Sequence, residues 1–171
     1  HVRHGAHVSL RAMNAADEAL AHVEIQSLLS RYYQALDVAD WRALETEVIA
    51  EDAVWELVQR CGDAVHEDRL EGRAALLSWF RQMLGGDVTM SRGAVRHFLN
   101  THVIEIARDG RSARSSSHLQ AVDGHAMAVV AMGFVEAEHV RTAQGWRIRR
   151  YRVDEHLRPE DMKALREMFQ R

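Results

Sequence analysis

The hydrophobic pattern of this chain changes period near its middle, and this change is the strongest constraint on the fold. From Asn14 onward, apolar residues recur every three or four positions, as on one face of a helix. After about residue 95, extended segments alternate with short turns that contain Asp and Gly. Helices followed by strands predict an α+β fold, with N-terminal helices packed against a curved, mainly antiparallel sheet. The apolar face of the first helix comprises Ala21, Ile25, Leu28, Leu29, Tyr32 and Leu36.

The expected elements follow from the residues that start and stop them. Asn14 is predicted to cap a long first helix, and Asp40 a short second one. The Gly85-Gly86 pair is a stop signal for a third helix. The expected elements are helices from Asn14 to about Asp37, Trp41 to about Glu47 and Glu71 to Leu84, strands over 53–58, 95–106, 112–122, 127–140 and 146–154, and a closing helix from Pro159.

Length and composition indicate one domain and exclude some partners. The 171 residues, 47% hydrophobic and 27% charged, suffice for a single core. A formal net charge of -3 gives no reason to expect nucleic acid. The lone Cys61, with no long apolar run, is typical of a cytoplasmic protein without a membrane partner. We expect 1–13 to be a disordered leader or a segment added for expression, 14–158 to form the domain, and 159–171 to form a C-terminal helix.

Two ionisable residues stand in apolar surroundings that normally exclude charge. Asp37, in RYYQALDVADW, falls where the first helix should end, and His97, in RHFLNTHVIEI, falls where a strand should begin. A carboxylate that orients a histidine forms a general base that works near neutral pH without metal or cofactor. The structural alternatives are that Asp37 bonds the turn at Ala39-Asp40 and that His97 is a satisfied core histidine.

The chain offers little for a metal site. It contains no HExxH sequence and no Cys cluster. His97 and His102 are five positions apart, so on a regular strand they would face opposite sides of the sheet. We therefore predict no metal and no cofactor.

The order of elements, together with the motifs at Asp37 and His97, resembles the nuclear transport factor 2-like, or SnoaL-like, superfamily of cone-shaped α+β barrels over about Ala16 to His156. It is most similar to the branch with scytalone dehydratase, bile-acid 7α-dehydratase and hexachlorocyclohexane dehydrochlorinase. The resemblance implies an Asp37–His97 pair, and catalytic roles for Tyr32 and His118. Tyr32 could instead be core filling, and His118 could lie on an exposed strand. The predicted substrate contacts are Tyr33, Trp55, Phe98 and Asn100.

The sequence also departs from that branch. Leu36 and Glu56 stand where scytalone dehydratase has tyrosines, and alternation along the strand places Glu56 toward solvent. The late arginine of the bile-acid enzyme falls near Glu155, with no secure counterpart. The chemistry could therefore be shared without the substrate.

The resemblance implies a cofactor-independent lyase, a dehydratase acting on a hydroxylated cyclic ketone such as a polyketide or steroid-like molecule. His97, held by Asp37, would remove a proton beside the carbonyl, while Tyr32 or His118 polarises that carbonyl or protonates the departing hydroxyl. The alternatives are an isomerase or polyketide cyclase, a non-catalytic subunit like the β subunit of ring-hydroxylating dioxygenases, and a small-ligand-binding module. A homo-oligomer is also expected, a trimer rather than a dimer.

Overall fold

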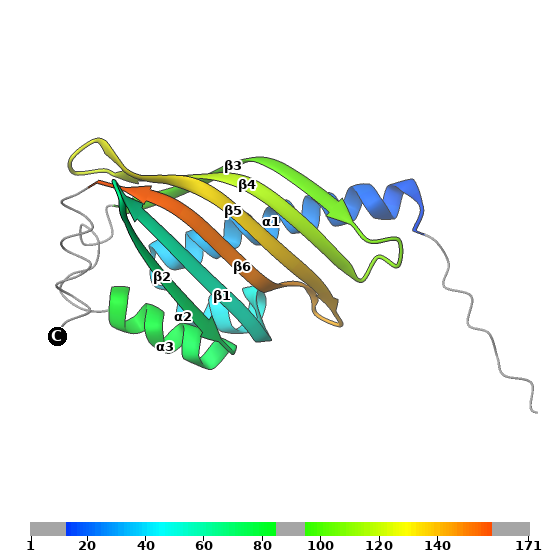
Figure 1. The fold of residues 1–171 in the computed structure, drawn as a ribbon. Helices are drawn as coiled ribbons and strands as arrows, with labels where there is room; N and C mark the ends of the chain where they lie inside the picture. Colours follow the sequence, from blue (N-terminus) through cyan, green and yellow to red (C-terminus); the bar gives the residue numbers. More distant parts are fainter. Residues whose placement is uncertain (1–12, 85–94, 159–171) are drawn as a thin grey trace, which may run out of the picture.

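The computed structural model describes residues 13–84 and 95–158, which form a curved sheet with helices packed against it (Figure 1). The predicted leader over 1–13, except Met13, lies outside the described residues, as do the Gly85-Gly86 stop and the closing helix from Pro159. Within the described part, no helix has the length and apolar character needed to cross a membrane.

The helices begin where the capping residues predict. Helix α1 (Ala15–Asp37) starts after Asn14, whose side-chain oxygen accepts the backbone N–H of Asp17 at 2.9 Å. The side chain of Asp40 accepts the N–H of Ala43 at 3.0 Å and caps α2. These two caps are confirmed. The remaining bounds are α2 (Trp41–Ala43), continued by a π-helical turn η1 (Leu44–Val48), and α3 (Arg73–Leu84).

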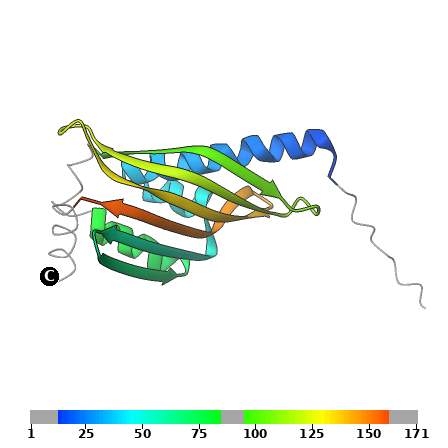
Figure 2. The ribbon, with the colours of Figure 1, turned by 45° about the horizontal axis from the view of Figure 1, so that its top comes forward.

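The sheet has six strands in the order β2-β1-β6-β5-β4-β3. Strands β3 to β6 form the predicted antiparallel meander, whereas β1 runs parallel to β6. The sheet is strongly curved but does not close, because β2 and β3 remain as its two edges (Figure 2). The bounds are β1 (Ile49–Cys61), β2 (Ala64–Glu71), β3 (Val95–Ile106), β4 (Ser112–Asp123), β5 (Ala128–Thr142) and β6 (Gly145–Leu157).

Strand β2 was not predicted. Its sequence AVHEDRLE alternates half-buried and exposed positions and has few apolar residues, because an edge strand needs little burial. It returns beside β1 through a tight hairpin at Gly62, whose φ of 56° favours glycine. The predicted third helix is correspondingly shorter at its start, beginning at Arg73.

One hydrophobic core joins the helices to the sheet. Helix α1 packs along β3 and β6, and α3 packs on β1 and β2. Ring contacts link the two helices, since the ring centroids of Tyr32 and Phe80 are 6.5 Å apart. We call the side of the sheet that meets these helices the inner face and the opposite side the outer face. Every residue of the predicted helical stripe is buried except Leu36, which is half-buried.

Candidate active site

Asp37 and His97 meet at the end of α1, as the sequence predicted. His97 Nδ1 lies 2.6 Å from Asp37 Oδ1, and the backbone N–H of His97 donates to Asp37 Oδ2 at 3.1 Å. The side chains are 14% and 8% exposed, so the pair is mostly shielded from water. A carboxylate that accepts from Nδ1 fixes the tautomer, because Nδ1 then carries the proton and Nε2 has the free electron pair. The imidazole can therefore act as a base through Nε2.

Asp37 sits where local helix chemistry disfavours it. It is the last residue of α1, at the negative end of the helix dipole, and the last turn contains no basic residue. The chain leaves the helix through Ala39, which has a φ of 57°, a left-handed conformation that a non-glycine residue adopts at some cost. The hydrogen bonds from His97 compensate for this placement. An acidic residue at a helix C-terminus and a left-handed backbone beside it are both locally unfavourable, and such unfavourable features occur together most often at functional sites.

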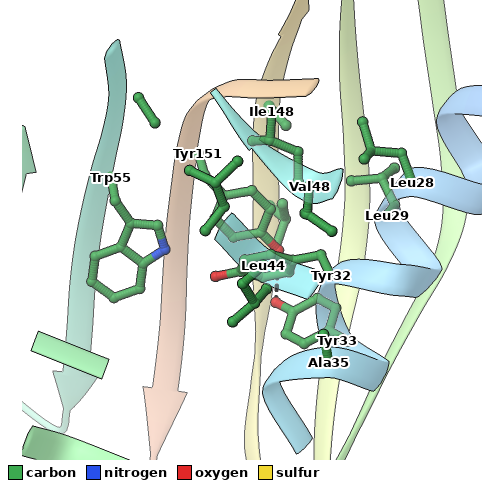
Figure 3. Packing of buried hydrophobic residues seen from close by; sticks show 14 of the residues in the cluster. Leu28, Leu29, Tyr32, Tyr33, Ala35, Leu44, Val48, Trp55, Ile148 and Tyr151 are labelled. Carbon is green, nitrogen blue, oxygen red and sulfur yellow. Dashed lines mark hydrogen bonds between the residues drawn. The ribbon is translucent and has the colours of Figure 1, made fainter. Parts of the chain in front are cut away.

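Tyr33 contacts the pair. Its ring stacks on the imidazole of His97, with centroids 4.9 Å apart and an angle of 19° between the planes. Its hydroxyl lies 2.7 Å from the hydroxyl of Tyr151, on β6. Burial raises the pKa of both tyrosines well above the ordinary value. Figure 3 shows the two phenols facing each other within the buried cluster. Tyr33, predicted only as a substrate contact, thus supports one side of His97.

Tyr32 packs deeper, on the far side of Tyr33. It is 2% exposed, and its ring centroid lies 4.9 Å from that of Tyr33 and 4.8 Å from that of Tyr151. Burial raises its pKa. Trp55 is also buried and turns inward from β1, against Trp79 and Phe80 at centroid distances of 5.1 and 5.7 Å. Tyr32 and Trp55 therefore belong to a buried cluster of aromatic rings in the core. Neither has a described contact with His97.

Three predicted residues lie on the other side of the sheet. His97 and Leu99 turn inward from β3, so the alternating Phe98 and Asn100 turn outward and are exposed. His118 is paired across the ladder with Asn100, so it shares the outer face. Its ring packs edge-on against the exposed Phe134, with centroids 5.0 Å apart. The structure therefore does not bring His118, Phe98 or Asn100 to the Asp37–His97 pair, because strand alternation and register turn them away.

Two polar residues that the sequence analysis did not assign also turn inward. The amide of Gln59, on β1, donates to Glu155 Oε1, on β6, at 2.8 Å. Burial raises the pKa of Glu155, and the hydrogen bond from Gln59 and the charge of His97 oppose that rise. Gln59 is 5% exposed. The signal was available in the alternation of β6, since Tyr151, Val153 and Glu155 share one face.

A β-bulge corrects the expectation for His102. The backbone at Thr101 has a φ of 52°, and the pairing of β3 with β4 shifts between Asn100 and Val103. The extra residue moves His102 to the inner face, where Nδ1 lies 2.8 Å from the hydroxyl of the buried Ser117. Even so, no group of three or more His, Cys, Asp or Glu side chains in residues 13–84 and 95–158 is placed to hold a metal ion.

Comparisons with known proteins agree with this fold. A model of the SnoaL-like domain matches residues 17–152. An NTF2-like protein with a cystatin-like fold from Novosphingobium aromaticivorans is 25% identical, with a TM-score of 0.62, over 90% of this chain and 93% of that one. A protein of the same species, named as a candidate scytalone dehydratase, is 17% identical, with a TM-score of 0.63, over 82% and 87% of the two chains. A candidate dehydratase of the NTF2-like family from Streptomyces avermitilis is 15% identical, with a TM-score of 0.58, over 81% and 97%.

At these identities the last two proteins show a shared fold. A search of curated proteins found no match. The family model, however, covers most of the chain, from the first turn of α1 to the middle of β6. The SnoaL-like family includes enzymes. The chain therefore belongs to the SnoaL-like family and has an NTF2-like fold.

Proposed function

We propose that this protein is a cofactor-independent lyase, a dehydratase that acts on a hydroxylated cyclic ketone. The observation that carries the proposal is the double hydrogen bond between Asp37 and His97, with 2.6 Å between Oδ1 and Nδ1. A carboxylate in this position has no partner other than His97 among the described hydrogen bonds and is poorly placed for the helix. Its role is to orient the imidazole.

The reaction begins with His97. Its Nε2 removes a proton from the carbon next to the substrate carbonyl, and Asp37 stabilises the positive charge that the imidazole gains. General base catalysis of this kind contributes about 10² to 10⁴-fold to the rate. Loss of the hydroxyl on the next carbon then forms the double bond and releases water.

The surroundings of the pair favour a flat, largely apolar substrate. Tyr33 and Tyr151 supply aromatic surface and two linked hydroxyls beside His97. A phenol can donate a hydrogen bond to a substrate carbonyl, so the Tyr33–Tyr151 pair can take the polarising role that the sequence analysis gave to Tyr32 or His118. Polyketide and steroid-like cyclic ketones match this combination of stacking surface and hydroxyl donors.

The test is turnover of a panel of cyclic β-hydroxy ketones, followed by the absorbance of the conjugated enone product. We expect turnover by the wild-type protein and a loss of at least about 10²-fold in His97→Gln. Asp37→Asn should also lose activity, because the neutral amide no longer stabilises the imidazolium. Glu51→Gln, an exposed carboxyl on β1, is the matched control and should remain active.

Thermal unfolding of each variant must show that the fold persists. A folded His97→Gln protein with full activity would contradict the proposal. Turnover of unconjugated enones but not of hydroxy ketones, with the same dependence on His97, would identify an isomerase instead. Tight binding of the panel without turnover would identify a ligand-binding module.

A further inference from the structure

The inner face carries a second polar pair, formed by Gln59 and Glu155. These residues are register partners on the parallel strands β1 and β6, and the Gln59 amide donates to Glu155 Oε1 at 2.8 Å. Gln59 is 5% exposed, and its own Oε1 is buried with no hydrogen-bond partner in the described part of the chain. A buried carbonyl oxygen without a partner is uncommon, because it costs about 1–3 kcal/mol. This pair therefore has unused hydrogen-bonding capacity in the interior.

The adjacent residue shows how the same strands hold an ionised carboxylate. Asp154 turns to the outer face and receives two hydrogen bonds from Arg60, at 2.7 and 2.8 Å. Arg60 keeps the pKa of Asp154 below its ordinary value. Glu155 is given a neutral amide in place of an arginine. One step along β1 and β6, the partner changes from a cation to a neutral donor. Burial raises the pKa of Glu155, whereas the hydrogen bond from Gln59 and the charge of His97 oppose that rise.

The backbone at Glu155 is closely confined. Gly133 on β5 is its register partner on the other side, and a Cβ atom added there would lie 2.7 Å from the Glu155 Cα and 2.2 Å from the Asp154 carbonyl oxygen. Strand β5 can approach this closely only because residue 133 has no side chain. The backbone of Glu155 is thus held between β1 and β5, and the hydrogen bond from Gln59 positions its carboxyl.

Glu155 also belongs to the neighbourhood of the Asp37–His97 pair. It shares the inward side of β6 with Tyr151, whose hydroxyl bonds Tyr33 against the imidazole, and the charge of His97 opposes the rise that burial causes in the pKa of Glu155. A base at His97 and a proton donor at Glu155 are the two groups that elimination of water requires.

We propose that Glu155 is the catalytic acid of this site and that Gln59 is its positioning residue; this inference rests on the dehydratase function proposed above. His97 Nε2 takes the proton from the carbon beside the carbonyl, and the electrons of that C–H bond form the C=C bond. The C–O bond to the hydroxyl breaks, and its oxygen takes the proton of Glu155, so water leaves. The proton on His97 then returns to Glu155, which restores both groups.

The leaving group provides the decisive experiment. Each hydroxy ketone that is turned over is compared with its acetoxy counterpart, because acetate departs without being protonated. We expect Glu155→Gln to lose about 10² to 10⁴-fold in turnover of the hydroxy ketone and to retain most of its turnover of the acetoxy ketone. His97→Gln should lose both, because both reactions need the base. Glu51→Gln should lose neither.

A second measurement needs no substrate. The infrared difference spectrum between wild-type protein and Glu155→Gln at neutral pH should contain the C=O band of a protonated carboxyl, and Gln59→Leu should shift that band. A merely structural role of Gln59 would leave the band unmoved.

Three results would overturn the assignment of Glu155. They are the bands of an ionised carboxylate at neutral pH, full turnover of the hydroxy ketone by Glu155→Gln, and equal losses on both substrates. If wild-type protein turns over neither substrate, the dehydratase function itself fails and the acid role fails with it. Activity that depends on His97 but not on Glu155 would remove only the present inference.

Discussion

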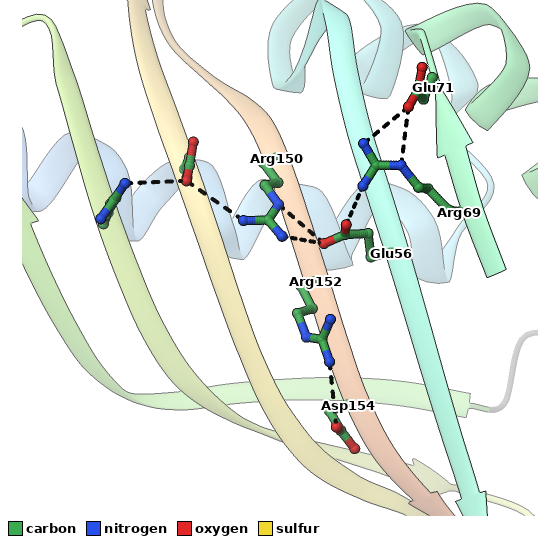
Figure 4. Close-up of polar contacts among 8 residues, drawn as sticks. Glu56, Arg69, Glu71, Arg150, Arg152 and Asp154 are labelled. Atoms are coloured by element: carbon green, nitrogen blue, oxygen red, sulfur yellow. Dashed lines mark hydrogen bonds and ion pairs between the residues drawn. The ribbon is translucent and has the colours of Figure 1, made fainter. Parts of the chain in front are cut away.

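The two faces of the sheet differ in how their charged and polar side chains are paired. On the outer face, carboxylates lie among arginines, as in the network that links Glu56 to Arg69 and Arg150 and the latter to Glu138 (Figure 4). On the inner face, the polar side chains form isolated pairs of mostly uncharged groups, such as Gln59 with Glu155 and the two tyrosine hydroxyls. Described inner pairs with opposite formal charges include Asp37 with His97, and His66 with Asp68 on β2.

This difference follows from water. Exposed ion pairs are screened and contribute little to stability, so many can be accommodated on the outer face. A hollow of about 310 Å³ on that face is lined by three arginines and three glutamates. A polar group on the inner face loses its hydration, so each one is costly unless it is paired. Polar groups kept there despite that cost are therefore the best candidates for function.

The largest expected contrast concerns the removal of one aromatic ring from each face. Tyr32 is 2% exposed, and Phe134 is 62% exposed. Tyr32→Ala should lower the free energy of unfolding by about 4 kcal/mol, because it leaves a cavity in the core. Phe134→Ala should change it by less than about 0.5 kcal/mol. Urea unfolding monitored by circular dichroism measures both. A comparable loss at Phe134 would show that this part of the outer face is covered in solution.

The second largest expected effect is a pH dependence of stability that comes from one buried histidine. His139 is 2% exposed, its Nε2 lies 2.8 Å from the Ser115 hydroxyl, and burial lowers its pKa from 6.5 to about 4. The unfolded chain binds a proton below pH 6.5, whereas the folded chain does not until about pH 4. Stability from this residue is therefore complete above pH 6.5 and is lost as the pH falls toward 4, by about 3 kcal/mol.

Urea unfolding at several pH values between 7 and 4 checks this expectation. His139→Gln should remove the loss that His139 causes. His118→Gln, on the outer face, is the matched control and should keep the wild-type pH dependence. An unchanged pH dependence in His139→Gln would refute the assignment of the effect to this residue.

The smallest effect is expected in the outer ion-pair network. Arg150 Nη2 lies 2.7 Å from Glu56 Oε2, and the Arg150 side chain is 45% exposed. Arg150→Gln should lower the free energy of unfolding by less than about 1 kcal/mol, and high salt should reduce the difference further. A loss of several kcal/mol that persists in high salt would mean that these ion pairs contribute as much to the free energy of unfolding as buried core residues do.

The sequence was informative wherever a local signal fixed the position of a residue. Asn14 and Asp40 are capping residues with their own chemistry, so the helix starts were readable. The end of the first helix and the beginning of a strand placed Asp37 and His97, and both landmarks are local. Homo-oligomer formation, the small-molecule substrate and the cytoplasmic location stay predictions.

What the sequence could not supply was orientation between elements. Tyr32 and Tyr33 are neighbours on α1, and which of them meets His97 depends on how the helix is rotated over the sheet. Phe98 and Asn100 could have been excluded by alternation once His97 was placed inward. His118 needed the register of β3 with β4, and His102 needed the bulge at Thr101. Glu155 became a candidate only when Gln59 was seen beside it.

The position of β6 has a consequence for biosynthesis. This strand is the last in the described chain, yet it lies between β1 and β5 in the sheet. Until β6 emerges from the ribosome, the β2–β1 hairpin and the β5–β4–β3 meander are not joined. The edges of β1 and β5 that β6 will pair with are then open to other chains. Asp37 and His97 are synthesised long before that moment, but Tyr151 and Glu155 arrive with the joining strand itself. A nascent chain therefore has no complete site until its sheet is also complete.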